Sequence, residues 1–289
     1  MSAEQQDKLI AELERIVLAR IAGGRLVLPV IPAVATKCIA ILRDPNFQQK
    51  KLVTLIESEP LLAAMIMKSA LSANYGGGEV SNIDQAVGRI GAQTLKTLIV
   101  EYMTRELFRS TDPRIQAASK KVWEHSLAVA HLARDIAALT GGAESDACYL
   151  AGLLHDVGKP IVAAMLLEAE KKLARDKPGW IEVGVWTATV ENTHRKVGVA
   201  LATEWKLPEN VAAGIRDCSD YDGANRQGPA NVVRFANALA KREGFTTGPI
   251  DAADVDALIM VGRSMLGADD ELIARLVAGI TERVTQSAA

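Results

Sequence analysis

The chain has 289 residues, of which 49% are hydrophobic, 4% are aromatic and 24% are charged. This length allows one large domain or two small ones, and the apolar fraction is enough for a core built mainly from Leu, Ile, Val and Ala. The formal net charge of -2 gives no overall attraction to nucleic acid or to an anionic membrane, so we expect neither as a partner.

Cysteine usage and the amino terminus both favour a cytoplasmic location. Cys38, Cys148 and Cys218 are far apart and form no CxxC pair, as is typical of a protein in a reducing compartment. The first residues are acidic where a secretory signal needs a basic start. The longest apolar runs are shorter than the ~18–20 residues that cross a bilayer. We therefore expect no membrane span.

The first third of the chain shows helical spacing of apolar residues. Residues 3–22 form an amphipathic pattern that ends at Gly23-Gly24, and we interpret its apolar stripe as facing the core rather than a docking partner. The prolines of residues 28–32 predict an extended segment. Helices are then expected at 34–42, 48–58, 60–73 and 83–107, the last with a break or close helix contact at Gly88 or Gly91.

The remainder is also helical in pattern. A long helix is expected from Asp112-Pro113 to Leu139. Val183-Gly184-Val185-Trp186 is the one plausible β run, and its helical surroundings argue against it. The sequence thus predicts an all-α, multi-helix bundle, with further helices at 145–157, 160–174, 180–193, 196–204, 208–217, 228–243, 252–266 and 269–286.

The sharpest local feature is a His-Asp pair, His155-Asp156, at the end of an apolar helical run. A buried imidazole and carboxylate are costly unless they bond to each other or to a cation. Together they offer one nitrogen and one oxygen ligand to a transition metal or to Mg²⁺. His125, on another expected helix, is a candidate for a further ligand. The alternative role for each histidine is structural, as a hydrogen-bonded residue of the core that binds no metal.

This order of residues resembles the HD superfamily of metal-dependent phosphohydrolases, which are helical bundles with a His, a His-Asp pair and a distant Asp as metal ligands. His125, His155 and Asp156 match the first three positions. The resemblance places the fourth at Asn237, whose amide oxygen brings no negative charge. It therefore implies a degenerate site at which a divalent metal such as Mn, Fe, Mg or Ni would bind weakly.

More of the chain, over residues 28–240, resembles the HDOD subfamily of bacterial signalling proteins. The resemblance rests on motifs in a fixed order: Leu28-Pro29-Val30-Ile31-Pro32, Glu59-Pro60-Leu61-Leu62, Ile83-Asp84-Gln85-Ala86 with Ile90-Gly91, Trp123-x-His125-Ser126, Gly152-Leu153-Leu154-His155-Asp156-Val157-Gly158-Lys159, Glu191-x-x-His194 and Trp205-x-Leu207-Pro208. The order of the motifs makes a chance match improbable.

The chain also departs from the family pattern. Leu71-Ser72-Ala73 stands where Asn-Ser-Ala is frequent, and Cys218-Ser219 stands where the family often has paired histidines. Losing that pair removes two candidate ligands of a two-metal site, which makes hydrolysis less favoured. The Gly-Tyr-Pro tripeptide of the cyclic-di-GMP phosphodiesterase branch is absent as well.

Several other residues have two interpretations. His194, near the expected site, is favoured as a hydrogen-bonding group over a ligand. Lys159 is a candidate phosphate contact. The favoured interpretation is that it caps the helix end beside Gly158. His131 lies on another side of the His125 helix and is taken as structural, and Cys218 as a buried thiol. Arg195-Lys196, like the other basic pairs, is taken as a solvated helix face.

We expect four parts along the chain: an amino-terminal amphipathic helix (1–24), an HDOD-specific helical subdomain (25–120), an HD-like helical subdomain (121–245) and two closing helices (246–289) that pack on the body. The favoured function is a bacterial signal-transduction regulator that binds a signalling protein, and a small phosphate-containing ligand, without catalysis. The alternative is a metal-dependent phosphohydrolase or phosphodiesterase acting on a nucleotide or cyclic dinucleotide.

Overall fold

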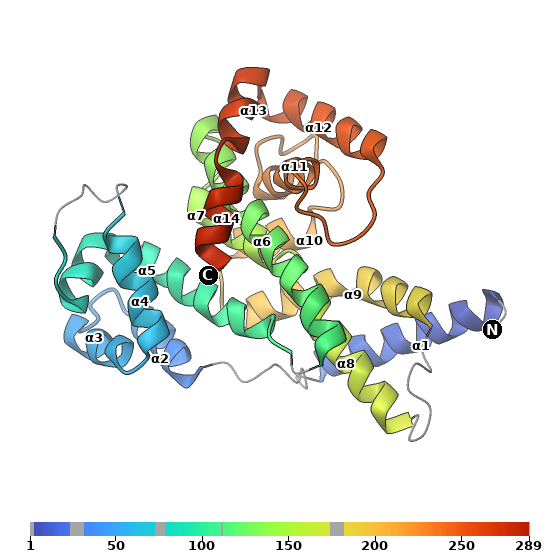
Figure 1. Cartoon of the computed structure of the whole chain (residues 1–289), viewed down its shortest axis with the longest axis horizontal. Helices are drawn as coiled ribbons and strands as arrows, with labels where there is room; N and C mark the ends of the chain where they lie inside the picture. Colours follow the sequence, from blue (N-terminus) through green and yellow to red (C-terminus); the bar gives the residue numbers. More distant parts are fainter. Residues whose placement is uncertain (1–2, 24–31, 73–78, 111, 174–181, 289) are drawn as a thin grey trace. The chain divides into compact units, whose positions relative to one another are not determined.

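The computed structural model describes residues 3–23, 32–72, 79–110, 112–173 and 182–288, and every regular element within these ranges is a helix (Figure 1). The all-α prediction is confirmed. Contacts divide the chain into two compact units, residues 29–107 and residues 1–28 with 108–289. These boundaries differ from the expected ones at 24, 120 and 245, since the first helix packs with the second half of the chain.

The smaller unit contains α2 (Ala33–Ile41), α3 (Gln49–Glu57), α4 (Pro60–Ala70) and α5 (Ile83–Leu107). Helices α2, α3 and α4 all pack on α5, and fully buried Ile56, Ile66 and Ile99 contribute to their shared core. Gly91 interrupts α5 with a φ of 75° and a ψ of 165°, which confirms the expected break. The proline-rich segment expected to be extended, except Pro32, and the glycine loop after Tyr75 lie outside the described residues.

The larger unit is built around α6 (Pro113–Thr140), which contacts α7 (Ser145–Leu154), α8 (Gly158–Leu173) and α11 (Pro229–Arg242). Residues 125–130 of α6 are all buried, so this part of the helix is covered on every side. Leu127, Leu153 and Phe235 are fully buried in this core. The functional candidates described below lie on the helices that surround it.

The amino-terminal helix α1 (Ala3–Ala22) packs on α8 and α9 (Val183–Glu204). Its apolar stripe faces this contact, since Leu13 and Val17 are buried at 3% and 1% exposure. Helix α9 is continuous where two helices were expected at 180–193 and 196–204, because no proline or left-handed glycine separates them. The doubtful β run at 183–186 is helical, as argued from its surroundings.

The carboxy-terminal part contains α10 (Glu209–Arg216), α12 (Ala252–Leu266), α13 (Asp270–Val277) and α14 (Ile280–Ala288). The single helix expected at 269–286 is two, because Gly279 adopts a φ of 70° that ends one helix and starts the next. Helices α13 and α14 both contact α6, and α12 contacts α11. Three helices rather than two therefore close the chain.

One stretch, Ser145–Glu170, has the length and mean hydropathy of a membrane-spanning segment, which the sequence did not lead us to expect. It comprises two helices, because α7 ends at Leu154 and α8 begins at Gly158. Within the protein, 78% of its most apolar window is buried. The apolar character of this stretch is therefore accounted for by the core of the larger unit.

Candidate metal centre

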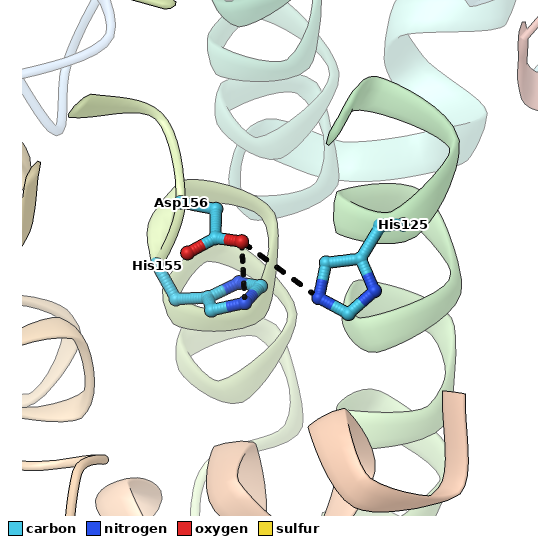
Figure 2. A group of neighbouring side chains, drawn as sticks. All are labelled: His125, His155 and Asp156. Carbon is cyan, nitrogen blue, oxygen red and sulfur yellow. Dashed lines mark ion pairs between the residues drawn. The ribbon is translucent and has the colours of Figure 1, made fainter. Parts of the chain in front are cut away.

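Three elements of the larger unit bring the predicted site residues together. His125 lies on α6, His155 and Asp156 occupy the turn between α7 and α8, and His194 lies on α9. Figure 2 shows His125 and His155 both directed toward the carboxylate of Asp156. The four side chains come from three segments that are far apart in the sequence, so the packing of these helices creates the site.

Two glycines allow this close packing. Gly152 lies where α7 meets α6, and a β-carbon there would be 3.0 Å from the Cα of Ala130. Gly158 begins α8 against α9, and a β-carbon there would collide with the carbonyl oxygen of His194. Any larger residue at position 158 would therefore push the turn that carries Asp156 away from the helix that carries His194.

The cluster of ligating atoms is compact and almost fully buried. The Nε2 atoms of His125 and His155 lie 3.8 Å and 3.5 Å from Oδ2 of Asp156. One ligand atom from each of the three residues lies within 4.8 Å of the others, which is a suitable spacing for a metal ion. The residues are exposed by only 1%, 1% and 4%.

Backbone carbonyls fix the tautomers of the histidines. Nδ1 of His125 lies 2.8 Å from the carbonyl oxygen of Phe245, and Nδ1 of His155 lies 2.7 Å from that of Gly152. Nδ1 of His194 makes the same kind of contact, at 3.1 Å, with Val190. A carbonyl only accepts hydrogen bonds, so each Nδ1 donates its proton, and in a neutral imidazole the Nε2 atom then carries a lone pair. This is the form in which histidine binds a metal through Nε2.

The Nε2 atoms of all three histidines converge on the carboxylate of Asp156. Nε2 of His194 lies 3.3 Å from Oδ1 of Asp156. Among the described residues, neither this atom nor Nε2 of His155 has a hydrogen-bond partner, although both are buried. Lone pairs that face a carboxylate repel it unless a cation lies between them. The residues present therefore fit a divalent ion held by His125, His155 and Asp156, with His194 adjacent.

A cation is already supplied by the chain. Nζ of Lys159 lies 3.1 Å from Oδ2 of Asp156 and 3.0 Å from Oε1 of Glu191. Burial opposes the charge of Lys159, but the two carboxylates outweigh it and raise its pKa. Burial likewise opposes ionisation of Asp156, but the Lys159 ammonium beside it counteracts burial, and the pKa of Asp156 lies well below its ordinary value. The Lys159-Asp156 pair is therefore charged.

Burial keeps the two cluster histidines neutral. Removal from water lowers the pKa of His125, and it lowers the pKa of His155 to about 3. The negative charge of Asp156 acts in the opposite direction on both but does not outweigh burial. Neutral imidazoles and an ionised carboxylate are the protonation states that metal ligands need.

Asn237, the expected fourth ligand, lies on α11, which packs on α6. Its Oδ1 atom is buried and has no hydrogen-bond partner among the described residues. An amide oxygen in this state is free to accept from a ligand or to coordinate an ion. Its role as a ligand stays a prediction.

Two cations near the cluster were not identified from the sequence as site residues. The charges of Asp156, Lys159, Glu191 and Arg195 all act on Lys241, whose pKa is lowered mainly by burial. Nε of Arg195 is buried, so this arginine is not part of a fully solvated helix face as the sequence suggested. The sequence could have indicated Lys241, because it follows Asn237 by four residues and so lies on the same face of α11.

Two residues taken as structural, His131 and Cys218, are not part of the group of His125, His155 and Asp156. Nε2 of His131 contacts Oγ of Ser287 at 3.1 Å, and the ring lies edge-on to Tyr149. The thiol of Cys218 is buried and donates to the carbonyl oxygen of Ile215, and burial raises its pKa. A protonated thiol is a poor metal ligand, so Cys218 does not replace the imidazole expected at this position.

Comparisons with known proteins agree on the family. The family model described as HDOD domain matches residues 28–221. An uncharacterized protein of Treponema pallidum is 29% identical over 196 residues, which are 64% of this chain and 37% of that relative. The matched region thus spans less than half of the relative's length.

Solved structures share the fold. One from Shewanella amazonensis, named "Putative metal-dependent phosphohydrolase", is 21% identical, with a TM-score of 0.79 over 98% of this chain and 100% of that one. One from Marinobacter aquaeolei, named "Putative signal transduction protein", is 22% identical, with a TM-score of 0.53 over 91% of this chain and 60% of that one. At these identities the similarity establishes the helical architecture alone.

Proposed function

This chain belongs to the HDOD domain family, and from that premise we propose that it is a bacterial signal-transduction regulator that binds without turnover. Its His-Asp centre is then a degenerate HD site with weak affinity for a divalent metal. Its partner is a signalling protein, with a small phosphate-containing ligand as a further candidate, rather than nucleic acid or a membrane. A cytoplasmic location agrees with three free, buried cysteines.

The observation that carries this proposal is the ion pair between Lys159 and Asp156. The cluster of His125, His155 and Asp156 contains one carboxylate, and its Oδ2 atom is within 3.1 Å of the Lys159 ammonium. A dication that binds there must displace the ammonium or accept its repulsion. Hard dications also prefer several oxygen ligands, whereas the histidines offer neutral nitrogen. Weak metal binding follows from both facts.

If a divalent ion is bound, His125, His155 and Asp156 would hold it, and it would supply Lewis acidity at the site. The residues of the chain have separate tasks. The carbonyls of Phe245 and Gly152 orient the imidazoles of His125 and His155. Lys159 offers a point charge to a phosphate, with Glu191 available to balance that charge when the phosphate is absent.

The second candidate function is metal-dependent phosphohydrolysis, and one observation favours it. The buried Nε2 atoms of His155 and His194 have no hydrogen-bond partner among the described residues, and the neutral His155 is in the tautomer that coordinates a metal. A site that is used only for packing would more economically bond these atoms to the protein. Burial of the cluster would also exclude bulk water from a reacting phosphate.

The test is turnover by the full chain after chelation and reloading with Mn²⁺, Fe²⁺, Mg²⁺ or Ni²⁺. The substrates are bis(p-nitrophenyl) phosphate and a panel of nucleotides and cyclic dinucleotides. His155→Ala removes a cluster ligand, and His131→Ala is the matched control, since His131 lies outside the cluster. We expect no rate above that of His155→Ala. A rate that His155→Ala abolishes and His131→Ala retains would contradict the regulatory proposal and assign hydrolysis.

A further inference from the structure

The larger unit contains a cavity of about 410 Å³ that the metal centre does not use. Its walls are one apolar stripe from each of three helices, α6, α8 and α9, including Ile115, Val122, Ala163, Leu167, Trp186 and Val190. The volume lies within the range of about 300–1,000 Å³ that is typical of small-molecule sites. A mostly apolar cavity of this size fits the hydrocarbon or aromatic body of a small ligand.

The cavity has one cationic end. Lys159 is among the residues that line it, and Glu191 lies beside Lys159. The charges of Arg195 and Lys241 also interact with this group of Lys159, Asp156 and Glu191. Lys159 is the one basic side chain among the described lining residues, and its charge favours an anionic group on the ligand.

Lys159 also has a donor for such a group. An ammonium has three N–H donors, and its ion pairs with Asp156 and Glu191 account for two of them. The Glu191 side chain is 51% exposed, so it can turn toward water when an anion approaches. The anion would thereby exchange places with Glu191 while the buried Lys159-Asp156 pair stays intact.

The other charged lining residue lies far from this end. Glu170 follows Lys159 by eleven residues on α8, which places it about 16 Å further along the helix. The lining residues of α8 between them are Pro160, Ala163 and Leu167, which are all apolar. The cavity is therefore complementary to an elongated, amphipathic ligand whose charged end lies at Lys159.

We propose that this cavity binds an organic anion with an apolar body, such as a medium-chain carboxylate or phosphate monoester, with its charged group held by Lys159. This proposal rests on the small phosphate-containing ligand of the function proposed above, but the site requires no metal, so binding in chelator tests it separately from metal binding and turnover. Binding would bring the ligand's charge beside the His-Asp centre and its body between α6, α8 and α9.

The test is calorimetric titration of the full chain in chelator with decanoate, decyl phosphate, decanol and decyltrimethylammonium, below their micellar concentrations. We expect saturable binding of at least one anion and affinity at least about tenfold lower for decanol, with the cation weakest. The anion that binds more tightly identifies the head group. Absence of saturable binding by both anions, or equal affinities for decanoate and decanol, would overturn the proposal.

Two alanines of α8 provide matched variants. Ala163 lines the cavity and Ala164 is exposed, so Ala163→Phe fills the cavity while Ala164→Phe adds the same ring outside it. Ala163→Phe should weaken anion binding at least about tenfold, and Ala164→Phe should leave it unchanged. If Ala163→Phe does not fold, Ala163→Leu is the smaller filling. Equal affinities of the Ala163 and Ala164 variants would place the ligand elsewhere and overturn the proposal.

Discussion

Nζ of Lys159 lies 3.1 Å from Oδ2 of Asp156, the same oxygen that faces the Nε2 atoms of His125 and His155. The position where a metal would gain most from the carboxylate is therefore shared with an ammonium of the same chain. This arrangement explains how a buried carboxylate stays ionised without a metal, and it makes metal affinity a competition between two cations.

Removing the Asp156 charge should destabilise the fold. Asp156→Asn leaves Lys159 buried beside a neutral amide, and breaking a buried ion pair in this way costs about 3–5 kcal/mol. Glu191→Gln removes the other partner of Lys159, but that side chain is 51% exposed, so we expect a loss below about 1 kcal/mol. Urea denaturation of both variants measures the difference. Equal losses would show that the pair with Asp156 is no more important than the outer one.

Gly158 should tolerate no side chain. Gly158→Ala places a methyl group against the carbonyl oxygen of His194, and we expect a loss of about 1–3 kcal/mol or more in unfolding free energy. Gly184→Ala on α9 is the control, since a β-carbon there meets nothing within 4 Å. Denaturation curves should separate the two variants. If Gly158→Ala is as stable as Gly184→Ala, the close contact between α8 and α9 is not as described.

Asn231 should be essential for the loop before α11. Its amide nitrogen donates to the carbonyl oxygens of Asp222, Asn225 and Arg226, and its Oδ1 accepts from the backbone of Asp222. Asn231→Asp removes all three donor bonds at a buried position, which should cost about 2–4 kcal/mol.

The control for this loop variant is Asn82→Asp in the smaller unit. Oδ1 of Asn82 accepts a hydrogen bond from the backbone N–H of Gln85, and a carboxylate can make the same bond. We expect a change below about 0.5 kcal/mol. Thermal denaturation compares the two, and a similar shift for both variants would refute the special role of the Asn231 amide.

His131 should make stability fall in mild acid. Burial lowers its pKa to about 3, whereas the unfolded chain binds the proton near the ordinary value of 6.5. The unfolded state therefore takes up protons first, and the free energy of unfolding decreases as the pH falls from about 6.5 toward 3. His131→Gln should flatten this slope between pH 7 and 4.5. An unchanged slope would mean that His131 is protonated in the folded state.

Much of the helical pattern could be predicted from sequence, because apolar periodicity, prolines and glycines act locally. The exceptions have local causes as well. Gly279 splits the last expected helix by adopting a left-handed conformation, and the absence of a breaker makes α9 continuous. The residue pattern alone does not tell which glycine adopts a left-handed conformation. It also does not tell whether a helix continues through a segment that contains no breaker.

The candidate metal centre shows a different limit of prediction from sequence. His125, His155 and Asp156 were found from residue types, and the structure brings them together. The ion pair of Lys159 with Asp156 and Glu191 depends on how α8 packs on α9, which sequence does not reveal. The carbonyl of Phe245 that orients His125 carries no sequence signal, because every residue has the same carbonyl group.

The most direct test of the competition between metal and ammonium is calorimetric titration of Mn²⁺ and Ni²⁺ into chelator-treated wild type and Lys159→Gln, with Lys8→Gln as an exposed charge control. Lys159→Gln should bind at least one of these ions about tenfold or more tightly than wild type, and the metal should raise its melting temperature. Lys8→Gln should match wild type. Unchanged or weaker metal binding by Lys159→Gln would contradict the view that the ammonium occupies the metal's place.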